Sequence, residues 1–196
     1  MSRAATTTRP TAPVAAPVAR GPRRAIGRRA AYGLGLLPAS AGVMMAVAVS
    51  GPAGGVDAAR RHLACGGPVP PLRDRVRGAR VMVHGLLGAV FGLLFWWLAG
   101  MALLATARGP FYGFVVAGPY DDAWGGPSLV GAWAAHAWAW VAVLGVLALV
   151  WWGLAALHVR LTEAVLGHGR RPWVLPVAGV VVLAAVLLVV GWVRQI

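Results

Sequence analysis

The sequence predicts an all-α integral membrane protein, built as a bundle of about four transmembrane segments. Of its 196 residues, 59% are hydrophobic, which is more apolar surface than a soluble domain of this length can bury. The formal net charge of +13 is carried by 18 arginines without a lysine. A basic chain can bind nucleic acid, but arginines that flank long apolar runs are typical of helices oriented in a lipid bilayer. We therefore expect association with a bilayer and not with nucleic acid.

The chain is predicted to have two parts, a cytoplasmic tail and one membrane domain. Residues 1–30 hold seven arginines, four prolines and no acidic residue. A segment of this composition cannot bury a core, so we expect it to be disordered. Residues 31–196 form the membrane domain, whose apolar segments lie at about 31–56, 81–105, 133–157 and 173–193.

The last three apolar segments are predicted to cross the membrane as helices. Each has the ~20 apolar residues that a helix needs to cross ~30 Å of hydrocarbon. Their only readily ionised side chains are His84 and His136, each near the end of a segment. Gly88 and Gly92, four residues apart on one helix face, permit close packing of the second segment, and we expect its neighbour to be another helix of this chain.

The first apolar segment, 31–56, allows three interpretations. Both of its flanks are rich in arginine and favour the cytoplasm, yet 26 residues make only ~39 Å of helix, enough for one crossing. The segment fits a re-entrant or shallow hairpin, a single span with the amino terminus outside, or the core of a signal peptide. Cleavage of a signal peptide would place the six arginines of 57–80 outside, against the positive-inside rule. Glycine and proline also make the segment a poor continuous helix; they are Gly33, Gly35, Pro38, Gly42, Gly51, Pro52, Gly54 and Gly55.

The charges between the apolar segments predict the topology of a multi-pass protein in a bacterial cell membrane. Residues 57–80 hold six arginines and two aspartates, and residues 158–172 hold three arginines and one glutamate. Residues 106–132 hold one arginine and two aspartates. The positive-inside rule therefore places 57–80 and 158–172 in the cytoplasm and 106–132 outside the cell. Gly66 and Gly167 are expected to end short helical extensions on the cytoplasmic side.

Three motifs between about residues 78 and 168 resemble a known family. They are the arginine-flanked helix RVMVHGLLGAVFGLLFWWLAGMALLA, the short outer segment PFY, and GLAALHVRLTEAVLG at the end of the next helix. Together they are similar to the sensor domain that actinobacteria place ahead of many histidine kinases. The basic stretch AARRHLACGGPVPP resembles the end of that family's first half. Two features differ, since the family's first half usually has two membrane helices and a kinase stands where this chain has a fourth apolar segment.

The histidines do not indicate a catalytic or metal site. A phospho-accepting histidine of a kinase normally has an acidic neighbour, whereas His158 is followed by Val159. We interpret His158 as a cap on the inner end of the third span, because a helix C-terminus favours a cationic group. His84 and His158 are expected at a similar inner level, but two histidines without a nearby carboxylate do not make a metal site. We therefore predict interfacial histidines, with no metal, cofactor or catalytic residue.

The outer segment 106–132 holds the candidate ligand-binding residues. Aromatic faces beside a local negative charge can bind a cationic or amphipathic ligand. The alternative, favoured by the turn-forming stretches GPYDD and GGP, is an interfacial aromatic loop with two solvated acids. The candidate residues are Tyr112, Tyr120, Asp121, Asp122 and Trp124.

The resemblance implies a non-enzymatic membrane sensor or signalling module. Because no effector domain is recognised in the chain, we expect it to act through a separate partner, such as a histidine kinase or a regulator. The alternative is an accessory or scaffold subunit of a membrane transporter complex. A transporter subunit is then the partner, and a homo-oligomer is compatible with either role. The last three apolar segments hold no ionised residue near their centres. This argues against transport by the protein alone.

Overall fold

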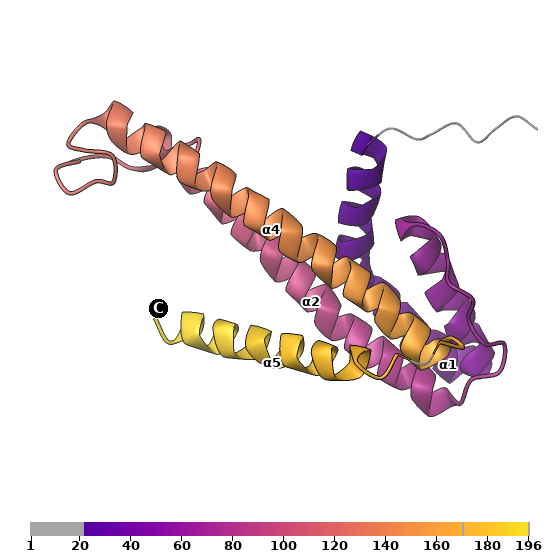
Figure 1. Ribbon diagram of the computed structural model, residues 1–196. Helices are drawn as coiled ribbons and strands as arrows, with labels where there is room; N and C mark the ends of the chain where they lie inside the picture. Colours follow the sequence, from indigo (N-terminus) through magenta and orange to yellow (C-terminus); the bar gives the residue numbers. More distant parts are fainter. Residues whose placement is uncertain (1–21, 170, 196) are drawn as a thin grey trace, which may run out of the picture.

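The computed structural model describes residues 22–169 and 171–195 (Figure 1). Over these residues the chain is all-α and has no strand, apart from one isolated antiparallel bridge between Leu72 and Gly167. Four helices are long and apolar enough to cross a membrane, so the prediction of an all-α membrane protein is confirmed. The helices are α1 (Pro22–Gly66), α2 (Gly78–Arg108), α3 (Tyr112–Val115), α4 (Leu129–Leu166) and α5 (Val174–Val193).

The structure describes only the last part, residues 22–30, of the segment that is predicted to be disordered. Residues 1–21 lie outside the described residues. Residues 22–30 form the first turns of α1, so the prediction that the tail extends to residue 30 is wrong. The first arm of α1 contacts α4 at Arg29. The Trp151 indole N–H donates to the Arg29 carbonyl at 3.1 Å, and the Arg29 guanidinium stacks 4.5 Å from the ring of Trp152.

Helix α1 is a hairpin of two helical arms. Gly51 lies outside helical geometry, with φ 73° and ψ −174°, a conformation that glycine adopts without steric cost. The two arms on either side of Gly51 run back along one another. The ring of Tyr32 on the first arm stacks on the ring of His62 on the second arm, at 4.6 Å between centroids. Nearer the turn, Gly55 packs against Val47. Of the three interpretations of the first segment, the structure agrees with the hairpin, with arms longer than the apolar run (Figure 1).

Helices α2 and α4 lie side by side and form the long axis of the molecule (Figure 1). Their far end carries the connection that contains α3, while their near end meets the α1 hairpin. Helix α5 packs against this near end through Val174 and Ala178 and then diverges from the pair. The buried core therefore sits where α1, α2 and α4 converge, and it includes Tyr32, Leu36, Phe91, Phe95, Leu161 and Leu166.

A row of glycines on α2 lets α1 approach it closely. A Cβ placed on Gly92 would lie 2.6 Å from the backbone nitrogen of Leu37. A Cβ on Gly88 would meet the Ser40 side chain, and one on Gly85 would meet Met44. The prediction that Gly88 and Gly92 serve packing within the chain is confirmed. Such small-residue contacts bring helix backbones together where lipid gives no hydrophobic drive for association.

We expect Gly92→Ala to lower the free energy of unfolding by about 1–3 kcal/mol, because the new methyl group meets backbone that has no rotamer to change. The control is Gly100→Ala in the same helix, where a Cβ has no neighbour within 4 Å. Alanine there is expected to be neutral or to stabilise the helix by up to about 1 kcal/mol. Denaturant titration of the detergent-solubilised protein, followed by tryptophan fluorescence, measures both. Equal effects of the two substitutions would contradict the close approach of α1 to α2.

Candidate functional site

Five polar side chains from α1, α2 and α4 meet inside the near end of the bundle. The Tyr32 hydroxyl lies 2.6 Å from Nδ1 of His158, and Nε2 of His84 lies 2.9 Å from Oγ1 of Thr162. The His84 and His158 rings are 5.5 Å apart between centroids, and His62 stacks on Tyr32. We call Tyr32, His62, His84, His158 and Thr162 the histidine cluster. His84, His158 and Thr162 are almost fully buried, with exposed fractions of 4%, 1% and 0%.

Proton positions in the cluster follow from its hydrogen bonds. The Thr162 hydroxyl donates to the His158 carbonyl at 2.9 Å, so its oxygen accepts from His84, which carries its proton on Nε2. The Tyr32 hydroxyl has no other acceptor within the described part of the chain, so it donates to Nδ1 of His158. Three buried ring nitrogens have no hydrogen-bond partner among the described residues: His62 Nε2, His84 Nδ1 and His158 Nε2.

These unpaired nitrogens carry an energetic cost that most buried polar groups avoid. The cluster is therefore the part of the described core where buried polar groups are least satisfied. Phe91 also packs on His158, at 5.7 Å between ring centroids. Within residues 22–169 and 171–195, no group of three or more His, Cys, Asp or Glu side chains is arranged to hold a metal ion.

The interpretation of His158 as a helix cap is wrong. Helix α4 continues to Leu166, and its C-cap is the predicted Gly167, whose N–H donates to the Glu163 carbonyl at 2.9 Å. The extra turns form because Leu161 and Leu166 are buried against neighbouring helices. His84 and His158 do lie at a similar level, as predicted, and both are buried in the core of the protein. Their position at the membrane interface stays a prediction.

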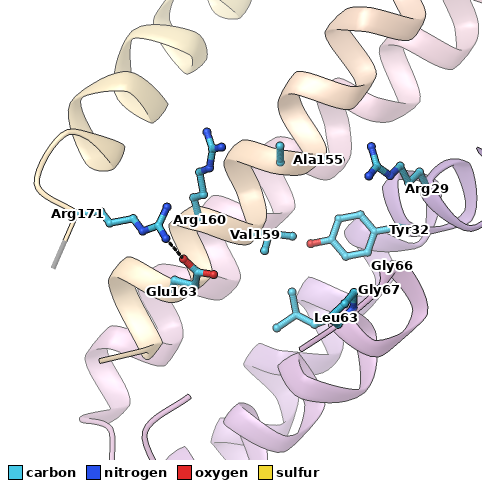
Figure 2. Close-up of a pocket in the computed structure, with 12 residues that line it drawn as sticks. Arg29, Tyr32, Leu63, Gly66, Gly67, Ala155, Val159, Arg160, Glu163 and Arg171 are labelled. Atoms are coloured by element: carbon cyan, nitrogen blue, oxygen red, sulfur yellow. Dashed lines mark ion pairs between the residues drawn. The ribbon is translucent and has the colours of Figure 1, made fainter. Parts of the chain in front are cut away.

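A second feature, next to the cluster, is a cavity of about 420 Å³ between α1 and α4, which we call the arginine pocket. Figure 2 shows Arg29 on one side of α4, with Arg160 and Arg171 on the other. Arg171 pairs with Glu163 at 3.3 Å. Arg29 and Arg160 form no ion pair within the described residues, and Arg160 lies 5.6 Å from the ring of Trp173. The pocket is lined in part by Arg29, Tyr32, Leu63, Arg160, Glu163 and Arg171.

The residues predicted to bind a ligand lie at the opposite end of the α2–α4 pair, in different environments. Tyr112 is buried and stacks on His136 at 3.8 Å between ring centroids. Tyr120 is half-buried, and its hydroxyl donates to the Val116 carbonyl at 3.1 Å. Exposed positions are occupied by Asp121, Asp122 and Trp124. None of these five residues lines a cavity described here.

Sequence reasoning missed Tyr32, His62 and Thr162 as partners of the two core histidines. The contact of Tyr32 with His62 depends on the hairpin turn at Gly51, which the sequence left as one of three possibilities. The available signal was Tyr32 itself, the only tyrosine in the first apolar segment. A buried tyrosine normally needs a hydrogen-bond partner.

Searches of protein-family models, of curated proteins and of solved structures gave no match for this chain. The resemblance to the kinase-linked sensor domain therefore stays a prediction that rests on the sequence motifs.

Tyr32→Phe is expected to lower the free energy of unfolding by about 1–3 kcal/mol, because it leaves the buried Nδ1 of His158 without its partner. The matched control is Tyr120→Phe, which removes a hydroxyl that is only half-buried and bonded to a backbone carbonyl. That change should cost at most about 1 kcal/mol. Denaturant unfolding of both variants in the same detergent compares them, and an equal or smaller loss for Tyr32→Phe would contradict the cluster geometry.

Proposed function

We propose that this protein is a non-enzymatic membrane signalling module that passes a signal from its aromatic loop to a separate partner protein. The observation that supports this role is the continuity of α2 and α4. Each is a single helix that runs from the loop at one end to the histidine cluster at the other. A ligand that displaces the loop therefore acts on the same two helices that hold His84, His158 and Thr162.

The loop is hydrogen-bonded to α4, and α4 is hydrogen-bonded to α2 close to the loop. The Trp133 indole N–H of α4 donates to the Pro110 carbonyl of the loop at 2.8 Å, and the Trp140 indole N–H of α4 donates to Oγ1 of Thr106 in α2 at 3.1 Å. Tyr112 stacks on His136 of α4. Movement of the loop is thus transmitted as a shift of α4 against α2, and helix shifts of ~1–2 Å are typical of signalling transitions.

At the other end, a shift of this size is enough to change the histidine cluster. The bonds from His84 to Thr162 and from His158 to Tyr32 cross from α4 to α2 and to α1. Hydrogen bonds weaken steeply when their geometry is disturbed, so a small slide of α4 separates these pairs and frees the α1 hairpin to move. The hairpin and the basic segments 57–80 and 158–172, on the predicted cytoplasmic side, then present the change to a partner.

An accessory subunit of a transporter complex is the second candidate, and one observation favours it. The α2–α4 pair beyond the α1 hairpin exposes large apolar side chains over its length. Lipid acyl chains can cover this surface, but so can the helices of another membrane protein. The side chains include Leu103, Trp138, Val141, Val146 and Leu149.

Crosslinking in native membranes, followed by mild-detergent purification and identification of what co-purifies, tests both roles. A histidine kinase or regulator recovered in stoichiometric amount supports signalling. A transporter permease or ATPase favours the accessory role, and recovery of the chain alone overturns both. In the first case, the combined change Asp121→Asn, Asp122→Asn and Trp124→Ala should alter the partner's regulated output. The control is Val186→Ala, at an exposed position of α5, and it should leave the response to the loop ligand unchanged.

The proposed topology has its own test in the sole cysteine, which is exposed in the second arm of α1. A membrane-impermeant thiol reagent should leave Cys65 unlabelled in intact cells and label it after lysis, because 57–80 is predicted to be cytoplasmic. As a control, Ala117→Cys in a Cys65→Ser background places a thiol in the predicted outer loop, where it should label in intact cells. Labelling of Cys65 before lysis would contradict the topology.

A further inference from the structure

The arginine pocket carries an excess of positive charge that the described residues do not balance. It contains three guanidinium groups against the single carboxylate of Glu163, which is held by Arg171. Arg29 and Arg160 stack on Trp152 and Trp173 instead of pairing with acids. Stacking on a ring face leaves the N–H edge of a guanidinium available, and this edge matches the oxygens of a phosphate group.

Next to the arginine pocket lies a second cavity, whose lining is mostly apolar. This apolar groove, of about 630 Å³, also lies between α1 and α4, and Arg29 lines both cavities. The two volumes, about 420 and 630 Å³, are within the range of small-molecule sites. The groove is lined chiefly by Ile26, Leu98, Leu144, Leu147, Ala148 and Trp151.

The order of the two cavities along α4 matches the orientation of a lipid in the cytoplasmic leaflet. The arginine pocket reaches Arg160 and Glu163, in the segment predicted to be cytoplasmic. The groove reaches from Trp151 back to Leu144, inside the predicted membrane span. An amphipathic anion bound across both would have its charged end at the interface and its chain toward the bilayer interior.

We propose that the arginine pocket and the apolar groove together form a binding site for an anionic phospholipid, with its phosphate group at Arg29, the residue that lines both cavities, and one acyl chain in the groove. Basic pockets between transmembrane helices on the cytoplasmic side are where such headgroups bind. The groove selects a lipid over free phosphate, because a phosphate ion leaves it unused. This site does not depend on the signalling role proposed above.

The first test measures lipid selectivity of the wild-type protein. Native mass spectrometry of the full chain, purified in mild detergent, compares phosphatidylglycerol with phosphatidylcholine of identical acyl chains. We expect at least about tenfold tighter binding of phosphatidylglycerol, since phosphatidylcholine has the same phosphate but also a quaternary ammonium group, which the arginines of the pocket repel. Equal binding of the two lipids overturns the proposal. Inorganic phosphate at millimolar concentration should not displace the bound lipid, and displacement would assign the pocket to free phosphate instead.

The second test locates the site. The double variant Arg29→Gln and Arg160→Gln should lose about tenfold or more in affinity for phosphatidylglycerol. The control variant, Arg75→Gln and Arg77→Gln, removes the same charge from exposed positions before α2 and should change the affinity by less than about twofold. Equal losses in the two variants would indicate general attraction by a basic face and overturn the pocket assignment. Unfolding midpoints of the variants verify that both are folded.

A separate variant tests whether the acyl chain lies in the apolar groove. Ala148→Trp fills the apolar groove without changing charge, and it should reduce binding of phosphatidylglycerol about tenfold. Binding of a water-soluble glycerophosphate, which has no acyl chain, should be unchanged by it. If Ala148→Trp leaves phosphatidylglycerol binding intact, the chain does not lie in the groove and this part of the proposal is wrong.

Discussion

The close approach of α1 to α2 is the constraint on which the rest of the structure depends. Lipid tails are as apolar as leucine, so helices in a bilayer associate through tight packing and hydrogen bonds and not through the hydrophobic effect. Gly92 against the backbone of Leu37, and Gly88 against Ser40, bring the two backbones together. Only at this separation can Tyr32 reach across to His158 on α4. The glycine row therefore determines where the polar groups of three helical segments meet.

This constraint divides the molecule into two regions of different stability. Near the α1 hairpin, α2 and α4 are surrounded by other helices, and the buried core is concentrated there. Beyond the hairpin, the same two helices contact mainly each other and the short segment around α3. The lightly packed end is expected to move more readily than the end where the core lies, because fewer packing contacts hold it in place. The histidine cluster lies at the near end, within the core, and three of its ring nitrogens have no hydrogen-bond partner among the described residues.

The sequence predicted the elements that follow from a single physical quantity and missed those that depend on tertiary contacts. The last three spans were predictable because bilayer thickness sets the length of an apolar run. The hairpin was not decided, since Gly51 is one of eight glycines and prolines in the first segment, and local sequence does not tell which one turns the chain. The prediction that His158 caps its helix was wrong for a related reason. The residues after His158 are polar enough to predict a short helical extension outside the membrane, yet Thr162 is fully buried by α1 and α2. Of the loop residues, Tyr112 was recognised as aromatic, but its stacking on His136 depends on how α3 folds back.

Tyr32 connects the two sites at the near end of the bundle. Its ring lines the arginine pocket, while its hydroxyl donates to His158 inside the histidine cluster. A lipid that contacts this ring in only one arrangement of the cluster binds that arrangement more tightly, and the difference in affinity stabilises it. Coupling of this kind is reciprocal, so any signal that changes the Tyr32–His158 pair must change the lipid affinity by the same factor. If lipid occupies the proposed site, the composition of the surrounding membrane and the position of α4 are linked through the Tyr32 side chain.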